Sequence, residues 1–199
     1  DAAKNAAMPD NIQTWIQLLF LASAMDEPIA TQSLSEKIAQ KFPEDARAQI
    51  IGATALRLGG DEVGALALVQ RASQSQPQNN WVKQSVLSEF TQLHAWLEAE
   101  KYLAGGPQDE NTWLMRGGLI LEAKQKEASE NFYASLLQQQ KQPGQKMQLL
   151  LGQLADSAGR WADAERLYRG ISASPERERA RLRLPAMLAK QGRWSEALK

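Results

Sequence analysis

The prolines of this 199-residue chain recur at a nearly constant interval, which constrains the fold more than any other sequence feature. The first three are 34 residues apart, and the series then continues with looser spacing. Six of the eight prolines belong to it: Pro9, Pro43, Pro77, Pro107, Pro143 and Pro175. Proline lacks a backbone N–H and disfavours helix in the residue before it, so it suits the boundary between two helices. The spacing predicts repeats of about 34 residues.

Each interval between prolines contains two helical patterns separated by a turn. After Pro43, residues 44–58 carry apolar side chains at three- and four-residue spacing, Gly59-Gly60-Asp61 interrupts them, and residues 62–76 resume the pattern. The same plan predicts the helix pairs 11–25 with 29–42, 81–93 with 96–104, 111–124 with 127–140, and 145–158 with 161–172, and a sixth pair that begins at residue 176. Good helix formers dominate the composition, so the predicted fold class is all-α.

The repeats resemble those of the tetratricopeptide repeat (TPR) family. The fifth repeat matches the family pattern best, at Leu151-Gly152, Gly159-Arg160-Trp161, Ala164, Tyr168 and Pro175. The second repeat has Gly60-Asp61 at the turn, and the sixth has Gly192-Arg193-Trp194. The resemblance implies one right-handed α-solenoid of antiparallel helix hairpins, with repeats at about 10–43, 44–77, 78–107, 108–143, 144–175 and 176–199. It also implies a non-enzymatic scaffold that binds other proteins.

The turns and the close helix crossings are less regular than the proline series. Three repeats lack glycine at the turn and have Asp26-Glu27-Pro28, Leu93-His94-Ala95-Trp96 and Lys124-Gln125-Lys126 instead. We expect Ala53, Gly117 and Gly152 where the two helices of one hairpin cross closely, because a larger side chain there would overpack. The phrase "GRW" recurs 33 residues apart, and we interpret its glycine as a helix end and its tryptophan as the side chain that docks the next helix.

The TPR resemblance implies that the first helices line a concave groove that takes a protein or a peptide. The predicted groove residues are Arg47, Ile50, Thr54, Arg57, Gln84, Ser88, Gln92, Leu149, Gln153, Asp156, Arg179 and Leu182, with Ala186 beside them. One TPR subclass grips a C-terminal carboxylate with Lys and Asn at fixed groove positions. This chain has other residue types there, which disfavours such a carboxylate clamp.

A basic segment, "PERERARLRLP", offers an alternative function. Arg177, Arg179, Arg181 and Arg183 form a broad basic band on the predicted helix, which suits nucleic acid or an acidic ligand. Glutamates 176 and 178 can pair with Arg179 and Arg181 at three-residue spacing, which favours an ordinary solvated surface over nucleic-acid binding. Pro185 is expected to kink or break this helix.

The sequence contains no recognisable catalytic set. His94 is the only histidine and falls in a repeat turn, there is no cysteine, and neither a nucleophile elbow nor a phosphate-binding glycine loop is present. The acidic pairs Asp61-Glu62 and Asp109-Glu110 lie at predicted helix starts, where the helix dipole favours negative charge. We therefore expect no enzymatic activity, no cofactor and no metal.

Tryptophan and glutamine are both abundant. We expect core packing for Trp96, Trp113, Trp161 and Trp194, whereas Trp15 and Trp81 are free to lie near the groove. The glutamine-rich stretch at 138–148 is interrupted by a Pro-Gly pair and is interpreted as a solvated helix end and turn.

The charge distribution, one apolar stretch and the last repeat lead to the remaining predictions. Residues 1–110 hold 8 Lys/Arg against 14 Asp/Glu, and residues 111–199 hold 15 against 9, an asymmetry that can steer partners or favour head-to-tail stacking. The apolar stretch 15–25 is shorter than the roughly 20 residues of a membrane span. We interpret the chain as a fragment with an incomplete last repeat, whose apolar face is expected to be covered either by residues that follow Lys199 or, through self-association, by a neighbouring molecule. Its resemblance to bacterial TPR modules of envelope assembly favours the cell envelope over the cytoplasm.

Overall fold

The computed structural model describes residues 10–75 and 79–198, and within them every regular element is a helix. The chain divides into two compact units, Asp1–Ala95 and Trp96–Lys199. The boundary falls inside the third predicted repeat, so the single continuous solenoid stays a prediction. Pro43, Pro107, Pro143 and Pro175 lie between helices as expected, whereas Pro9 and Pro77 lie outside the described residues.

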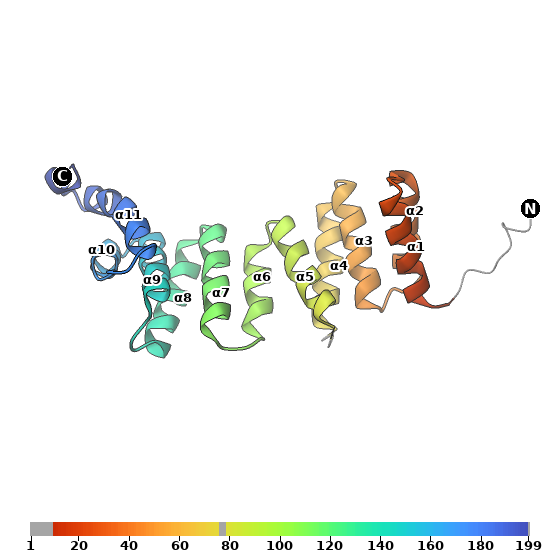
Figure 1. Cartoon of the computed structure of the whole chain (residues 1–199), viewed down its shortest axis with the longest axis horizontal. Helices are drawn as coiled ribbons and strands as arrows, with labels where there is room; N and C mark the ends of the chain where they lie inside the picture. The colour runs from red at the N-terminus through yellow and green to blue at the C-terminus, as the bar shows by residue number, and fades with distance from the viewer. Residues whose placement is uncertain (1–9, 76–78, 199) are drawn as a thin grey trace, which may run out of the picture. The chain divides into compact units, whose positions relative to one another are not determined.

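The first unit contains two helix hairpins and one further helix (Figure 1). Its helices are α1 (Ile12–Ala24), α2 (Pro28–Lys41), α3 (Ala46–Leu58), α4 (Glu62–Gln74) and α5 (Asn80–Gln92). Trp15, Ile16 and Ile38 form an apolar core together with Ala48 and Ile51, so α1, α2 and α3 bury one another's apolar faces. Burial between neighbouring hairpins is what the repeat pattern requires, because one hairpin cannot enclose its own apolar face.

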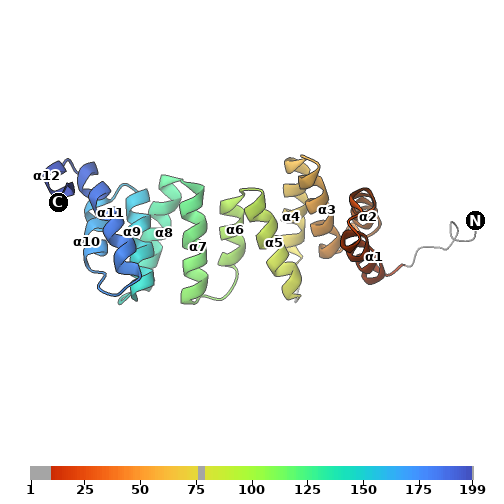
Figure 2. The ribbon, with the colours of Figure 1, turned by 45° about the horizontal axis from the view of Figure 1, so that its top comes forward.

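The second unit continues the same plan (Figure 2). Its helices are α6 (Trp96–Ala104), α7 (Glu110–Ala123), α8 (Lys126–Gln139), α9 (Gln145–Ser157), α10 (Trp161–Arg169), α11 (Glu176–Lys190) and the four-residue α12 (Trp194–Ala197). A large core joins side chains of α7 to α11, with Tyr133, Leu151 and Tyr168 among its largest fully buried or nearly buried members. The all-α class is confirmed, and a helix lies over each predicted helical stretch. The pairing of α5 with α6 spans the boundary between the two units and stays a prediction.

One residue with positive φ lies in the turn after each first helix. In the described part of the chain these residues are Asp26, Gly60, His94, Lys124, Gly159 and Gly192. At five of the six turns, all except the one at Lys124, the following N–H bonds the carbonyl five residues back, as in a Schellman motif. Two of the three turns without glycine, those at Asp26 and His94, therefore have the same backbone conformation as the glycine turns, whereas the Lys124 turn shares the positive φ without that hydrogen bond. Asp and His tolerate this left-handed region better than most side chains.

Lys124 is the least suited of these residues to its φ of 53°. Lysine in the left-handed region is strained, and glycine is not. We expect Lys124→Gly to raise the free energy of unfolding by about 0.5–1 kcal/mol. Urea unfolding followed by far-UV circular dichroism measures this. The matched control is Ala123→Gly at the last residue of α7, which should lower stability by up to about 1 kcal/mol. A loss of stability in Lys124→Gly would contradict the prediction.

Two local predictions need correction. The helix does not break at Pro185, because α11 runs from Glu176 to Lys190 and buries Ala180 before the proline and Met187 after it, and the kink stays a prediction. A Cβ placed on Gly117 would meet Leu150 of the next hairpin at 2.5 Å, so its close crossing is not within its own hairpin. Gly152 does meet its own hairpin partner, as expected: a Cβ there would lie 2.5 Å from the Tyr168 ring.

The glutamine-rich stretch also does more than face solvent. The Gln148 amide donates to the Leu167 carbonyl at 3.0 Å, and the Gln145 side-chain oxygen accepts from the backbone N–H groups of Ser172 and Ala173. These bonds hold the end of α10 and the loop after it against α9. They accompany the end of α10 at Arg169, three residues earlier than the sequence pattern indicates.

Candidate functional site

The predicted groove residues of α5 form an exposed polar stripe. Gln84, Ser88 and Gln92 are spaced by four residues, so they lie on one helix face, and all three are exposed. Trp81 begins the same face and is 40% exposed. Within the described residues the side chains of Gln84, Ser88 and Gln92 make no hydrogen bond to another residue. These four residues are called the α5 stripe below.

The predicted groove residues of α3 serve the first unit itself. Ile50 is 3% exposed and therefore cannot reach a partner. Thr54 Oγ1 donates to Glu89 Oε1 at 2.8 Å, and Arg57 Nε donates to Glu89 Oε2 at 2.9 Å, which ties α3 to α5. Arg47 pairs with Asp45 at 2.7 Å, and this hydrogen bond lowers the pKa of Asp45 although burial opposes it.

The predicted groove residues of the second unit divide in the same way. Leu149 is buried and Gln153 is half-buried. Asp156 of α9 forms an ion pair with Lys190 of α11 at 2.7 Å. Arg179 and Leu182 on α11 are exposed, and Leu182 is among the most exposed large apolar side chains of the described chain. The predicted groove residues of the second unit that are exposed therefore lie on α11.

The four arginines of the basic band are all exposed. The expected pairs of Glu176 and Glu178 with Arg179 and Arg181 do not form. Glu176 is buried instead, and Glu178 lies 3.4 Å from Arg177. Among the described residues no carboxylate lies within ion-pair distance of Arg179, Arg181 or Arg183. The band therefore keeps most of its positive charge uncompensated by the chain.

The "GRW" phrases join consecutive hairpins through their arginines. Arg160 pairs with Glu130 of α8 at 2.6 Å and with Asp163 at 2.9 Å. Arg193 repeats this geometry one hairpin later, with Glu165 of α10 at 2.6 Å and Glu196 at 2.6 Å. Each arginine thus reaches back to the preceding second helix and forward to the acid three residues on. Sequence reasoning missed this role, although an acid follows each arginine by three residues.

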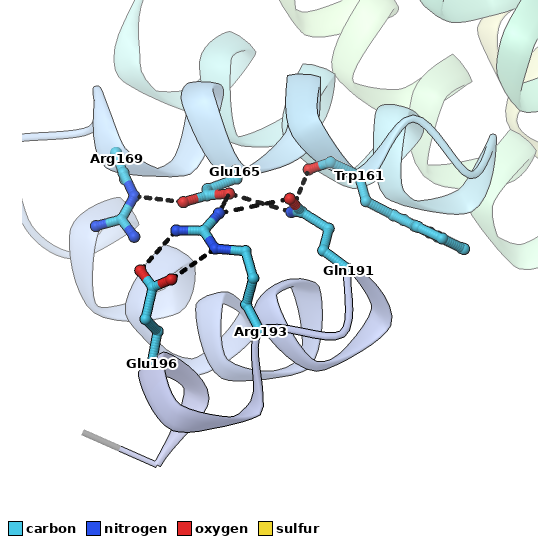
Figure 3. Close-up of polar contacts among 6 residues, drawn as sticks. All are labelled: Trp161, Glu165, Arg169, Gln191, Arg193 and Glu196. Atoms are coloured by element: carbon cyan, nitrogen blue, oxygen red, sulfur yellow. Dashed lines mark hydrogen bonds and ion pairs between the residues drawn. The ribbon is translucent and has the colours of Figure 1, made fainter.

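Glu165 is the centre of the second of these contacts (Figure 3). Its carboxylate accepts from Arg169 at 2.8 Å, from Gln191 at 3.1 Å and from Arg193 at 2.6 Å. Arg193 comes from the turn between α11 and α12, and its other bonds to Glu196 are bidentate. Glu165 itself is buried, so these donors replace the water that its charge has lost.

A third glutamate occupies the same repeat position. Glu100, Glu130 and Glu165 each lie six residues after the positive-φ residue of their hairpin. Glu100 pairs with Arg116 of α7 at 2.6 Å, and the Arg116 guanidinium also lies over the Phe132 ring. One glutamate–arginine pair therefore connects each second helix from α6 to α10 with the following hairpin. These pairs are structural, and they are not candidates for partner binding.

The tryptophans are distributed differently from the prediction. Trp113 packs against the core as expected, and Trp96 is half-buried. Trp161 and Trp194 are 38% and 64% exposed, so the prediction that they dock the next helix was wrong. Figure 3 shows the Trp161 ring pointing away from the Glu165 contacts. Trp15, which the sequence left free to lie near the groove, is buried beside Phe42.

The Glu165 contacts predict a pH dependence of stability. Burial acts to raise the pKa of Glu165, but hydrogen bonds from Arg169, Gln191 and Arg193 outweigh it and lower the pKa from its ordinary 4.5. A carboxyl whose pKa is lower in the folded state stabilises the fold above its unfolded pKa and loses this contribution as pH falls through the folded pKa. Glu165→Gln should therefore cost about 1 kcal/mol near pH 7 and less near pH 3.

Urea unfolding at a series of pH values measures this difference. The matched control is Glu127→Gln on the exposed start of α8, which should stay within about 0.5 kcal/mol of the parent at every pH, the size of a helix-dipole contribution at an exposed site. A Glu165→Gln cost that stays constant down to about pH 3 would contradict the assignment.

The residues considered for catalysis have structural roles. His94 lies in the turn after α5, as predicted. Asp61 and Asp109 cap helices, accepting from the N–H groups of Gly64 at 2.9 Å and Thr112 at 2.8 Å. In the described ranges, no group of three or more His, Asp or Glu side chains is placed to hold a metal ion, and no helix has the length and apolarity needed to cross a membrane.

Comparison with known proteins bears on the fold. No protein-family model matches the chain, and a search of the curated proteins finds no match. The crystal structure of a tetratricopeptide repeat protein from Parabacteroides merdae is 14% identical, covers 94% of this chain and 76% of that one, and superposes with a TM-score of 0.57. A structure of PilF from Pseudomonas aeruginosa is 16% identical over 94% of this chain and 88% of that one, with a TM-score of 0.43. The first comparison shows that the chain has a TPR-like fold of helix hairpins.

Proposed function

We propose that the chain is a non-enzymatic scaffold that binds a protein or peptide through the α5 stripe. TPR-like folds typically mediate protein–protein interaction, which is the general role that the comparison supports. The observation that supports the specific site is the exposure of Gln84, Ser88 and Gln92 on one face beside Trp81. The equivalent polar residues of α3 are used in contacts to Asp45 and Glu89.

The chemistry of the α5 stripe suits an extended peptide. A glutamine amide offers two N–H donors and one oxygen acceptor, which match the N–H and C=O groups of a peptide backbone. Four residues of α-helix rise about 6 Å, and two residues of extended chain span about 6.6 Å. A peptide lying along α5 would therefore present a backbone amide to Gln84, Ser88 and Gln92 in turn. Trp81 supplies an apolar surface at one end of the stripe.

Charged substitutions in the α5 stripe test this function. The chain would be immobilised and exposed to native lysate, and retained proteins would be identified by mass spectrometry. We expect Gln84→Arg with Ser88→Arg to lose the retained proteins, because two bulky charges block the stripe without disturbing the core. The matched control is Gln70→Arg with Gln74→Arg on the exposed face of α4, which should retain them.

One further measurement makes the outcome clear. Circular dichroism should show the same helix content for both double variants, because all four substituted residues are exposed. If the α5 variant retains the same proteins in the same amounts as the control, the α5 stripe is not the binding site. Arg57 is unsuitable for such a test. Removing its guanidinium would leave the buried Glu89 carboxylate without its ion-pair partner, so the variant would measure stability and not partner binding.

A further inference from the structure

The edge of the first unit that carries its helix turns exposes branched apolar side chains. Ile29 of α2 and Val63 of α4 each lie three residues after the positive-φ residue of their hairpin, and they are 85% and 83% exposed. In the fourth, fifth and sixth hairpins this position holds Glu127, Ala162 and Ser195, which are also exposed. The position is thus open in both units, but the first unit fills it with aliphatic side chains that water solvates poorly.

Neighbouring hairpins do not cover this repeat position. The second hairpin follows that of Ile29 within the unit, and its helix α3 packs against α2, yet Ile29 stays exposed. The first hairpin precedes that of Val63 and α5 packs against α4, yet Val63 stays exposed as well. Because a hairpin on either side leaves the position open, the exposure of these two side chains belongs to the hairpin stack itself.

An open depression lies on the face of α2 that includes Ile29. Its volume is about 420 Å³, and its lining residues are Pro28, Ile29, Gln32, Ser33 and Glu36. Gln32 approaches the next hairpin, because a Cβ placed on Gly59 would lie 3.9 Å from the Gln32 Nε2 atom. The depression therefore adjoins the turn between α3 and α4, which is the junction between the first two hairpins.

The same kind of junction in the second unit is closed by an arginine. There Arg160 follows the positive-φ residue of its turn and reaches back to Glu130 at 2.6 Å. The equivalent residues of the first unit are Asp61 and Gln32, which cannot form an ion pair. Gln32 donates to Glu36 at 3.1 Å instead, and Asp61 caps α4. The depression thus lies at a junction without the guanidinium that the second unit supplies.

The surroundings of this junction are negatively charged. Asp26, Glu27, Glu36, Asp61 and Glu62 are all exposed, and none of them forms an ion pair with another described residue. Residues 10–36 and 58–70 contain no Lys, Arg or His. A positively charged ligand is attracted to such a surface, whereas the phosphates of nucleic acid and of anionic lipid are repelled.

We infer that this edge of the first unit docks a basic amphipathic segment of a partner protein. The surface consists of Ile29, Gln32, Glu36, Glu62 and Val63 and is called the acidic edge below. An arginine of the partner would enter the depression and pair with Glu36 and the acids of the α3–α4 turn, in place of the arginine that the chain lacks there. Apolar side chains of the same segment would cover Ile29 and Val63. The inference rests on the proposed protein-binding role but uses a different surface from the α5 stripe.

Binding of synthetic peptides to the whole chain tests the inference. The probe is a fluorescently labelled helical peptide with leucines on one face and flanking arginines, and its comparison has glutamate in place of every arginine. Fluorescence anisotropy in about 0.15 M salt measures affinity. We expect the arginine peptide to bind and the glutamate peptide not to bind. Ile29→Ser with Val63→Ser, and separately Glu36→Lys with Glu62→Lys, should each weaken binding at least about tenfold.

Matched substitutions in the second unit provide the controls. Leu137→Ser with Leu182→Ser removes two exposed aliphatic side chains and should leave peptide binding unchanged. Glu122→Lys with Glu127→Lys makes the same change in net charge as the acidic-edge variant, and Glu127 lies in the first turn of its helix as Glu62 does. It should also leave binding unchanged. Circular dichroism should show the same helix content for every variant, because all the substituted residues are exposed.

The two proposed surfaces can fail separately. The acidic-edge variants should still retain the lysate proteins that the α5 stripe binds. Gln84→Ala with Ser88→Ala should still bind the arginine peptide, since it changes the α5 stripe without changing charge. Loss of lysate capture in the α5 variants alone therefore concerns the proposed function, and loss of peptide binding in the acidic-edge variants alone concerns this inference.

Several results would overturn the inference. They are equal binding of the arginine and glutamate peptides, no binding of the arginine peptide, and undiminished binding by the acidic-edge variants. An equal loss of binding in Glu122→Lys with Glu127→Lys would show that net charge and not this surface attracts the peptide. Sedimentation of the unliganded chain adds another test, because self-association abolished by Ile29→Ser with Val63→Ser would make a second copy the occupant instead of a basic partner.

Discussion

Replacing Arg57 by methionine is expected to lower the free energy of unfolding by about 2–3 kcal/mol. Arg57 Nε donates to Glu89 Oε2 at 2.9 Å, and Glu89 is buried between α3 and α5. Without the guanidinium, the carboxylate keeps only Thr54 as a side-chain donor in a place from which water is largely excluded. An unpaired buried charge costs more than the ion pair contributes, which makes this loss large for a single side chain. Urea unfolding followed by far-UV circular dichroism measures it.

The control separates the buried charge from the loss of one arginine. Arg71→Met removes an exposed arginine from α4 and should change stability by less than about 0.5 kcal/mol. Adding Glu89→Leu to Arg57→Met should recover most of the loss, because both charges are then gone. If Arg57→Met were as stable as the parent, Arg57 would be free for a partner, as its predicted groove position implies.

Valine at position 152 is expected to lower the free energy of unfolding by about 3 kcal/mol. A Cβ on Gly152 would lie 2.5 Å from Cε1 and 2.8 Å from Cδ1 of Tyr168, and the two methyl groups of valine would extend further into the ring. Tyr168 is 2% exposed and is enclosed by the core of the second unit, so it has no room to turn away. Thermal and urea unfolding both measure the loss.

Gly118 provides a matched control for this substitution. It lies inside α7, and a Cβ there would meet no atom within 4 Å. Gly118→Val makes the same chemical change in a helix, so it includes the same difference in helix propensity, and it should change stability by less than about 0.5 kcal/mol. Equal effects at the two positions would show that close helix approach is not the reason for glycine at position 152.

The helices and their order could be predicted because their signals are local. Pro43 and Pro143 mark boundaries through their own backbone chemistry, and the apolar spacing between prolines repeats within each helix. The turn at His94 was harder, because the family pattern has glycine there. In the structure His94 has the same positive φ as the turn glycines. The reason is that the flanking helices and their Schellman hydrogen bonds determine that backbone conformation.

The candidate site could be predicted only in part, because exposure depends on which helix covers which face. Ile50 and Leu182 have equivalent repeat positions, yet one is 3% exposed and the other 83%. The same holds for the arginines: Arg57 is used by Glu89, whereas Arg179 has no carboxylate near it in the described chain. No spacing rule within a single helix distinguishes these cases.

By itself, the sequence determined an all-α chain of repeated helix hairpins, because proline spacing, helical periodicity and good helix formers act through local backbone physics. Only the tertiary structure decided the meaning of "GRW". Its glycine ends a helix as expected, but Arg160 and Arg193 join consecutive hairpins through Glu130 and Glu165, while the tryptophans remain substantially exposed. Ion pairs between residues about 30 positions apart depend on how neighbouring hairpins pack. That packing cannot be predicted from the sequence of a single repeat.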